Sequence, residues 1–325
     1  MEIIYKNIYE WQKPVLTEKL SYELLRDDPL KCKSTYLAVP WSTLIDKLDY
    51  GSPADKKSAE LQVKKLEELR LDNAFTVCQH DRFHLIIPTL KKIGVNVLFA
   101  SHMVSQSGYT TKDFFLETKG YPHKFDGIQI DTILLSPVFV GKPNKEKDIL
   151  YSFVGSYGNK HLSDIRDKIF KDKGHNNAII IERVGWQFDL DVYQDQVLNN
   201  PISSVQQYIN NEKAKFYEET LTRSRFSLCP SGTGPTSIRF LESLGSGAIP
   251  IILADTMMLP TIKEINWDDC TLKIPEKNYN NLRDILSKIT PEKEKQMRQK
   301  GLQAYKLCTG KNFTRNIRQY YDPLY

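Results

Sequence analysis

The sequence lacks several features that would place it quickly in a protein class. Its five cysteines are widely spread and form no Cys-x-x-Cys pair, which argues against a disulfide framework and a structural zinc site. Its glycine-rich stretches carry neither a following Gly-Lys-Ser/Thr nor the Gly-x-Gly-x-x-Gly pattern, which excludes P-loop and dinucleotide fingerprints. It has no signal-peptide pattern and no apolar run of membrane-span length. We therefore expect a cytoplasmic protein, with peripheral membrane contact left open.

The composition is that of a globular protein. The chain has 325 residues, 40% of them hydrophobic, which is enough for two domains that each bury a core. Its 45 Lys and Arg against 40 Asp and Glu give a formal net charge of +5, and no basic block is long enough to indicate nucleic-acid binding. A mildly basic surface is compatible with anionic substrates.

Strand-like and helix-like segments alternate along the chain, which predicts an α/β fold. The expected strands and helices of the first half are Thr35–Pro40, Ala54–Arg70, Phe75–Gln79, Arg82–Ile93, Val95–Ser101 and Ile128–Leu135. The polar segment Ser136–Asp148 is interpreted as a linker. We expect two domains, residues 1–143 and 144–325, with a cleft between them.

The pattern restarts after the linker. The expected elements are a strand at Ile149–Val154, a helix at Leu162–Phe170 and a strand at Ala178–Val184. The tail Pro291–Tyr325 is interpreted as two helices joined around Gly310, of which the last can cross back to the first domain.

The window "CPSGTGPTSIRFLESLGSGAIPIIL", residues 229–253, predicts a βαβ unit. Its parts are a strand at Phe226–Cys229, a loop at Pro230–Gly234, a helix at Pro235–Ser246 and a strand at Ile249–Leu253. Arg239 then lies near the N-terminus of a helix that follows a parallel strand, where α/β sheets hold anionic ligands.

This window has the residue types of a phosphate site. Gly232 and Gly234 let the backbone approach a ligand, and the hydroxyls of the window come from Ser231, Thr233, Thr236 and Ser237. Arg239 can contact a phosphate with a charge-assisted hydrogen bond of about 1.5–3 kcal/mol. Glu242, on the same helical face, can accept from a ribose diol. Alternatively, Arg239 and Glu242 pair with each other along the helix.

The run from Arg223 to Pro260 resembles the C-terminal signature of the exostosin family of glycosyltransferases. The matching residues are Ser224, Phe226, Leu228, Pro230, Gly232, Ser237, Arg239, Glu242, Gly247, Ile249, Pro250, Asp255, Leu259 and Pro260. Upstream, Phe153, Gly155 and Arg166 match a second segment of the family. "YLAVPW" and "VLFASH" are more loosely similar to its N-terminal half.

The resemblance implies a GT-B architecture, in which two Rossmann-like α/β domains face each other across a cleft. It implies an inverting glycosyltransferase that moves a sugar from a UDP-activated donor, held by the second domain, to a glycan acceptor in surface polysaccharide or glycoconjugate synthesis. Glu242 fits the second glutamate of a two-glutamate pattern found in many GT-B enzymes. Gly234 stands eight residues earlier, where the first glutamate would be.

The resemblance and the residue types together indicate how the reaction runs. The departing diphosphate would be stabilised by Arg239, by the amides of the loop Ser231–Gly234 and by the helix N-terminus, without a metal or other cofactor. Arg166, which follows the turn at Gly155, is a second phosphate ligand, or else an ordinary arginine on a surface helix.

A general base is expected from the first domain in this architecture. In "TVCQHDRFH" an apolar strand ends at Gln79 and places His80 and Asp81 on a strand-to-helix turn, and His102 occupies the equivalent turn after the next strand. We rank Asp81 first, then His80 and His102. Each of the three is also suited to capping a strand end.

Three alternatives remain open. Asp189 and Asp191 have the Asp-x-Asp spacing with which metal-dependent GT-A transferases hold manganese, although one chance match is expected in a chain of this length. A GT-B epimerase or phosphorylase would share the phosphate-binding unit but need no acceptor site. A non-catalytic protein of the same fold would bind a glycan or nucleotide sugar without turnover.

Overall fold

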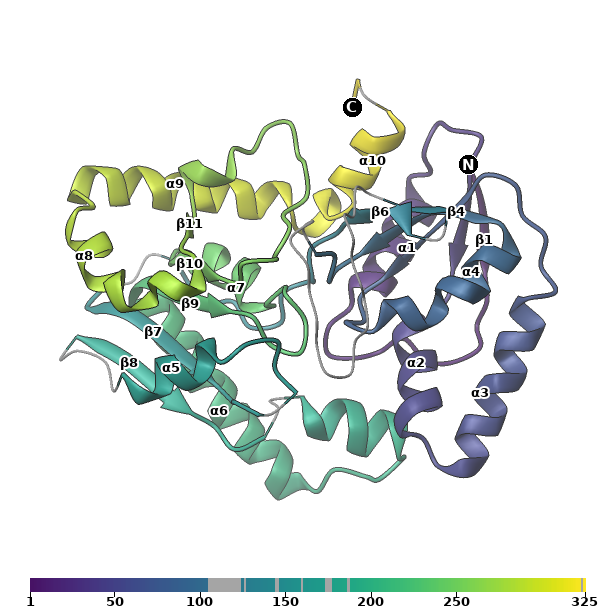
Figure 1. The fold of residues 1–325 in the computed structure, drawn as a ribbon, viewed down its shortest axis with the longest axis horizontal. Helices are drawn as coiled ribbons and strands as arrows, with labels where there is room; N and C mark the ends of the chain where they lie inside the picture. The colour runs from purple at the N-terminus through teal and green to yellow at the C-terminus, as the bar shows by residue number, and fades with distance from the viewer. Residues whose placement is uncertain are drawn as a thin grey trace.

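The computed structural model describes residues 1–104, 124–125, 127–143, 146–158, 160–172, 177–185, 188–322 and 324–325. Two sheets, each with its own helices, lie side by side (Figure 1). The first sheet has the strand order β1-β2-β3-β4-β6-β5 and is parallel except for the antiparallel β5. Its strands are β1 (Glu2–Tyr5), β2 (Thr35–Ala38), β3 (Ala74–Cys78), β4 (Val95–Ala100), β5 (Lys124–Phe125) and β6 (Ile128–Thr132).

Helices cover both faces of the first sheet, because alternate residues of each strand point to opposite faces. One face, with Leu37 and Leu98, packs against α2, α3 and α4, and the other face, with Tyr36 and Phe99, packs against α1. These helices are α1 (Thr17–Asp27), α2 (Trp41–Tyr50), α3 (Pro53–Leu66) and α4 (Ile87–Ile93), the last preceded by η1 (Phe83–Ile86). The first domain is therefore a three-layer α/β/α unit.

The second sheet is parallel throughout and has the strand order β11-β10-β9-β7-β8. Its strands are β7 (Ile149–Gly155), β8 (Ala178–Glu182), β9 (Ser224–Pro230), β10 (Ile249–Leu253) and β11 (Leu272–Lys273). Its helices are α5 (Ile165–Lys171), η2 (Leu190–Val197, a π-helix), α6 (Ser204–Arg223), α7 (Arg239–Gly245), η4 (Glu276–Asn281), α8 (Leu282–Ser287) and α9 (Pro291–Leu307). Two parallel α/β domains confirm the predicted GT-B fold class.

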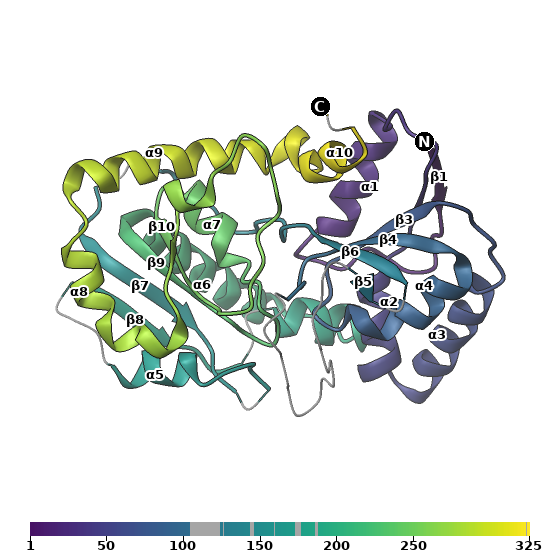
Figure 2. The ribbon, with the colours of Figure 1, turned by 45° about the horizontal axis from the view of Figure 1, so that its top comes forward.

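The last helix, α10 (Arg315–Tyr321), leaves the second domain and packs on the first (Figure 2). Ile317 lies in the core cluster of the first sheet. The Asn316 side chain donates to the Thr132 carbonyl over 2.7 Å, and the Arg318 guanidinium donates to the Asp28 carbonyl over 2.8 Å. The C-terminal helix thus ties the two domains together.

The segment interpreted as a linker is anchored along its described part. The Ser136 amide donates to Thr17 in the first domain over 2.8 Å, whereas the Gly141 amide donates to Ser246 in the second over 3.0 Å. A polar composition predicted an exposed connection, but a backbone that crosses between two domains must have its amides satisfied, and here side chains from both domains do so.

Two departures from the expectation concern the second domain. The helix predicted from Pro235 begins only at Arg239, because residues 231–238 form an irregular loop that includes a bond from the Gly232 amide to the Gly234 carbonyl over 2.9 Å. The 20-residue α6 was not predicted, although Ser203 and Gln206 form a capping box at its start. Its surface is mostly polar, so it carries little hydrophobic periodicity.

Candidate functional site

The carboxyl ends of the two sheets meet. His80 and Asp81 follow β3, and the Asp81 carboxylate lies within hydrogen-bonding reach of Thr233, in the loop after β9. His102, which follows β4, packs against Gly234 so closely that a Cβ added there would lie 2.2 Å from its Nδ1. We call His80, Asp81 and His102 the first-domain edge.

The opposing residues form what we call the second-domain edge: Arg166, the loop Ser231–Gly234, and Arg239. Arg239 is the first residue of α7 and is only 7% exposed. Its guanidinium donates to the Val154 carbonyl at the end of β7 and lies 4.6 Å from the centre of the Phe153 ring. Its Nε is buried and has no hydrogen-bond partner among the residues that the structure describes. Arg239 therefore keeps donor capacity that the protein does not use.

Arg166 lies beside Arg239 at the same edge. Its Nε donates to the Ser231 carbonyl over 2.7 Å and its Nη1 to the Ser156 carbonyl over 2.9 Å. Burial, together with the charge of Arg239, lowers the pKa of Arg166 to about 9. Within the part of the chain that the structure describes, neither guanidinium forms an ion pair. Two neighbouring cations with only carbonyl partners make a site that favours an anion.

The glycines of this edge allow close packing around the two arginines. A Cβ at Gly232 would lie 2.9 Å from the Arg166 guanidinium, and one at Gly155 would lie 2.9 Å from the Phe153 ring. Ser231 is buried, and its hydroxyl is 3.3 Å from both Ser163 and Glu276. Thr233 is exposed and Ser237 is half-buried. The side chains of the loop therefore lie around the two arginines but do not enclose the guanidiniums.

Glu242 is 1% exposed and binds backbone. Its Oε1 accepts from the Val138 amide over 3.2 Å and from the Phe139 amide over 3.0 Å, and its Oε2 accepts from the Tyr217 hydroxyl over 2.7 Å. Burial raises the pKa of Glu242, and these hydrogen bonds and the charge of Arg239 oppose that rise. Glu242 does not form a salt bridge with Arg239, so the alternative of a helical ion pair is wrong. The predicted contact with a ribose stays a prediction.

The His80 ring lies between two carboxylates. Asp46 Oδ1 is 3.1 Å from its Nε2, and Asp81 Oδ1 is 3.1 Å from its Nδ1. Burial alone would lower the pKa of His80, but the two carboxylates outweigh it and raise the pKa to about 10. The same proximity lowers the pKa of Asp81, against the opposing effect of its burial. His80 is therefore a cation at neutral pH and Asp81 an anion.

His102 is in the opposite state. Burial lowers the pKa of His102 to about 4, and its Nδ1 is buried and has no hydrogen-bond partner in the described part of the chain. The structure thus brings all three predicted first-domain residues together and gives them different charges: a cationic His80, an anionic Asp81 and a neutral His102. Asp81 and His102 are the two that reach the second-domain edge.

Sequence reasoning missed several polar residues behind these side chains. They are Gln12, Glu18, Asp46 and Gln79. Glu18 is 2% exposed and accepts from the Ser42 hydroxyl and the Gln79 amide, and burial raises its pKa to about 7. Asp46 lies on a helix with an ordinary amphipathic pattern, so only the fold reveals its position. In the sequence, the one sign of these polar residues was Gln79, a glutamine directly after the apolar strand β3.

The Asp-x-Asp pair lies at the start of η2. Asp189 stands at the N-cap position of η2 without a side-chain capping bond among the described residues, and burial and the charge of Asp195 raise the pKa of Asp191. Across the described residues, no group of three or more His, Cys, Asp or Glu could hold a metal ion. In that same part of the chain, no helix is both long and apolar enough to cross a bilayer.

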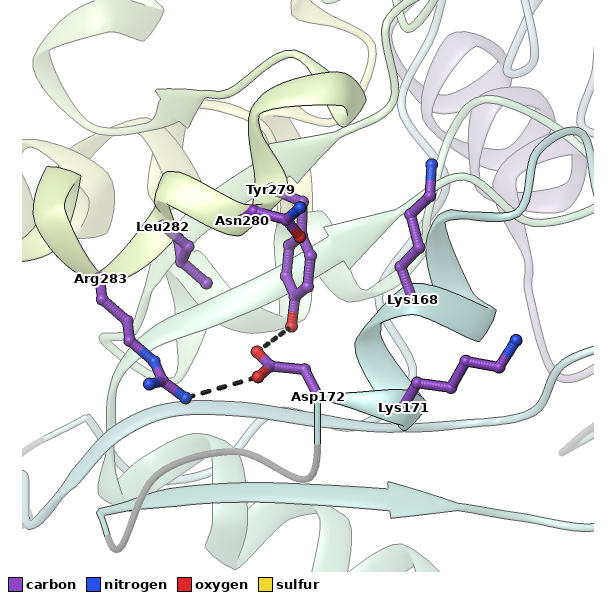
Figure 3. A pocket seen from close by; sticks show the side chains of 7 residues that line it. All are labelled: Lys168, Lys171, Asp172, Tyr279, Asn280, Leu282 and Arg283. Atoms are coloured by element: carbon purple, nitrogen blue, oxygen red, sulfur yellow. Dashed lines mark hydrogen bonds and ion pairs between the residues drawn. The ribbon is translucent and has the colours of Figure 1, made fainter.

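A cavity of about 460 Å³ lies elsewhere on the second domain, between the C-terminal end of α5 and the start of α8. Figure 3 shows Tyr279 and Arg283 pointing toward Asp172, and the Tyr279 hydroxyl donates to that carboxylate over 3.0 Å. Lys168 and Lys171 point away from Asp172 and pair with aspartates one turn earlier in α5. The cationic side chains that line this cavity, Lys168, Lys171 and Arg283, each pair with a carboxylate. In contrast, Arg166 and Arg239 form no ion pair with the described residues.

Comparison with known proteins agrees with the residue pattern. The chain is 35% identical over 82 residues to a probable glucuronoxylan glucuronosyltransferase of Arabidopsis thaliana, over 25% of this chain and 18% of the relative. It is 39% identical over 84 residues to a probable beta-1,4-xylosyltransferase of the same plant, over 26% of this chain and 20% of the relative. An exostosin-1 homolog of Caenorhabditis elegans is 30% identical over 118 residues, 36% of this chain and 29% of the relative. Each match spans less than a third of the relative's length.

Solved structures give looser matches. TarM covers 80% of this chain and 57% of its own with a TM-score of 0.43 and 12% identity. The pneumococcal O-GlcNAc transferase GtfA, solved with UDP and GlcNAc, covers 94% and 59% with a TM-score of 0.40 and 11% identity. The family model of the exostosin GT47 domain matches residues 34–289, which include both edges of the site. The chain belongs to the exostosin GT47 family.

Proposed function

We propose that this protein is an inverting glycosyltransferase that moves a sugar from a nucleotide-sugar donor, with UDP as the expected nucleotide, to a glycan acceptor. Its family membership and the names of its relatives, which are glucuronosyl- and xylosyltransferases, support sugar transfer. Metal independence and a cytoplasmic location are further parts of this proposal.

The observation that carries the proposal is the pair Arg166 and Arg239. Buried cations are normally paired, because an uncompensated charge away from water is costly. Here the buried guanidinium of Arg239 and the half-buried guanidinium of Arg166 lie next to a glycine-containing loop, and their hydrogen-bond acceptors among the described residues are carbonyls alone. A diphosphate bound between them would supply the missing negative charge and would receive the Arg239 donor that has no partner.

The reaction in this proposal is a single in-line displacement. The acceptor hydroxyl oxygen forms a bond to the anomeric carbon while the bond from that carbon to the phosphate oxygen breaks, and the diphosphate leaves with the electron pair. Arg166 and Arg239 stabilise the charge that develops on the leaving group. Attack from the face opposite the leaving group inverts the anomeric centre.

Asp81 is the best-placed acceptor of the hydroxyl proton. It is ionised, it is close to Thr233 across the domain contact, and its neighbour His80 is already protonated and so cannot accept a proton. His102 is the second choice, since it is neutral and its Nδ1 accepts no hydrogen bond from the described residues. Replacing each with an amide side chain that cannot take up the proton, Asp81→Asn and His102→Gln, should separate the two by the size of the loss in transfer rate.

Thermal unfolding with UDP, GDP, CDP and ADP, with and without manganese, tests donor binding. A ligand at one hundred times its dissociation constant stabilises the folded state by about 2.7 kcal/mol, which raises the melting temperature by several degrees. We expect UDP to do this without metal, and Arg239→Ala to abolish it. Arg283→Ala, at the separate cavity, is the matched control and should retain the shift.

Product analysis then tests transfer itself. The names of the relatives make UDP-glucuronic acid and UDP-xylose the first donors to assay, and the anomeric configuration of the product reports inversion. A UDP-dependent shift without any transfer or donor hydrolysis would support the non-catalytic alternative. A shift that strictly required manganese would contradict metal-independent binding.

A further inference from the structure

Behind Asp81 the first domain contains a buried chain of polar side chains that the proposed mechanism does not yet use. Asp81 contacts His80, His80 contacts Asp46, and Asp46 accepts from the Gln12 side chain. Gln12 in turn accepts from the Gln79 side chain over 3.3 Å. The chain of contacts runs from the domain contact into the interior of the first domain.

Within this chain of contacts, Asp46 is the charged residue that does not reach the domain contact. It lies on α2, is 1% exposed, and uses one carboxylate oxygen for His80 Nε2 and the other for the Gln12 side chain. A buried carboxylate without a cation would be costly, so Asp46 and a protonated His80 stabilise each other. Asp46 therefore sets the charge of the ring that contacts Asp81.

The protonation state of His80 decides what its Nδ1 can do. A protonated ring carries a hydrogen on Nδ1 and donates it to Asp81, 3.1 Å away. The structure also places the Arg82 amide in hydrogen-bond geometry 2.9 Å from the same Nδ1, a contact that only a ring without a hydrogen on Nδ1 can accept. The two contacts are alternatives, and only the first holds the Asp81 carboxylate.

We propose that Asp46 is a positioning residue for the transfer reaction: by keeping His80 protonated on both nitrogens, it fixes the Asp81 carboxylate at the domain contact and keeps it ionised. This inference rests on the proposed role of Asp81 as the base. In a catalytic triad a carboxylate orients a histidine that acts as the base. Here Asp46 likewise orients a histidine, but the proposed base is a second carboxylate, Asp81.

Other charged groups around His80 would also influence its titration. They are Glu18 on α1, Asp49 on α2, Arg82 and His84 on its own loop, and His102 after β4, while Tyr193 on η2 is coupled to Asp46 and Asp81. Asp49 pairs with Arg82, and burial lowers the pKa of both His84 and His102 to about 4. Asp46 and Asp81 are the carboxylates in direct contact with the ring.

Nitrogen-15 NMR of histidine-labelled protein reads the charge of His80 without any activity assay, with the signal assigned by its loss in His80→Asn. We expect the imidazolium pattern at pH 8 in the wild type and the neutral pattern at pH 8 in Asp46→Asn. A carbon-13 titration of the Asp81 carboxyl should show its pKa rising in Asp46→Asn. A neutral His80 at pH 8 in the wild type, or an Asp81 titration unchanged in the variant, would overturn the proposal.

The pH dependence of transfer tests the positioning role. Asp46→Asn should lower the transfer rate about tenfold at pH 7. Because this variant also has a lower pKa at His80, its activity should fall further as the pH rises through that pKa. The wild type should show no such fall below pH 9. Glu294→Gln makes the same change at a buried carboxylate of the second domain, which pairs with Arg225 and Arg298, and should leave the profile unchanged. An identical profile in Asp46→Asn would reduce Asp46 to a structural residue.

A second variant protects the test against simple misfolding. Gln12→Met removes a hydrogen bond to Asp46 but retains both carboxylates, so His80 should keep its imidazolium signal at pH 8. A neutral ring in Gln12→Met would contradict the assignment of the charge to Asp46 and Asp81. If the wild type failed to transfer any sugar, the proposed function would fall, while the two NMR titrations would still decide the charge states.

Discussion

The two facing edges of this protein differ in how their charged side chains are paired. At the first-domain edge the His80 cation is matched on both sides by carboxylates, Asp46 and Asp81. At the second-domain edge Arg166 and Arg239 lie together with carbonyl partners and no ion pair in the described part of the chain. An edge whose charges are paired is preorganised for chemistry, and an edge with surplus positive charge is complete only with an anionic ligand.

The largest expected effect comes from removing the surplus charge. Arg166→Met and Arg239→Met should each weaken UDP binding about 10- to 100-fold, because each removes charge-assisted hydrogen bonds of about 1.5–3 kcal/mol, and the double variant should weaken it about 1000-fold. Isothermal titration calorimetry measures this. Arg283→Met should bind UDP like the wild type, and equal weakening by this control would show that the edge is not the site.

The pH dependence of the free energy of unfolding should report on Glu18, which is buried behind the first-domain edge. Burial disfavours the charged form of Glu18 and raises its pKa in the folded protein from the ordinary value of 4.5 to about 7. Its contribution to stability is therefore fully present below pH 4.5 and is lost as pH rises through 7, a change of up to about 3 kcal/mol.

Urea unfolding of wild type and Glu18→Gln between pH 4.5 and 8 checks this. The difference between the two free energies of unfolding should change by up to about 3 kcal/mol across that range, with the variant gaining relative to the wild type as pH rises. A constant difference would mean that Glu18 does not titrate there.

The contact between the edges can be broken at Gly234. A Cβ there would lie 2.2 Å from His102 Nδ1 and 2.8 Å from its Cε1, so Gly234→Ala must push the two edges apart. Misplacement of reacting groups by about 1 Å costs about 100-fold in rate, and we expect a loss of that order in transfer.

Two comparisons show whether the clash is the cause. Gly158→Ala should have little effect, because nothing lies within 4 Å of the added Cβ. The double variant Gly234→Ala with His102→Ala should recover the melting temperature that Gly234→Ala alone loses. Additive losses in the double variant would point to a different origin.

The smallest effect is expected at Glu242. In Glu242→Gln the amide oxygen can still accept from the Val138 and Phe139 backbone, while the amide nitrogen replaces the acceptor of the Tyr217 hydroxyl, so we expect a loss of about 1 kcal/mol in the free energy of unfolding. UDP affinity should change little if Glu242 chiefly holds residues 138–139. A selective rise in the KM for the donor would instead support its predicted contact with ribose.

Much of the fold was predictable because local patterns and global arrangement agree. Apolar strands bounded by turns predicted β2, β3, β4, β7 and β9, and the two-domain α/β architecture followed from their alternation with helices. Predictions failed where a segment's environment is set by distant residues. The loop before Arg239 looked like a helix start because of Pro235, but it packs against His102 from the other domain.

The sequence by itself determined which residues stand at the ends of parallel strands, because in a parallel sheet every strand ends at the same edge. That is why His80 and Asp81 could be named in advance, whereas Arg239 was named from its place on the helix that follows a strand and Arg166 from its match to the family pattern. Only the tertiary structure decided their charge states and partners. Asp46, Gln12 and Glu18 reach the site from helices and loops far away in sequence, and the pKa of a buried group depends on which charges surround it in space and how much water it has lost.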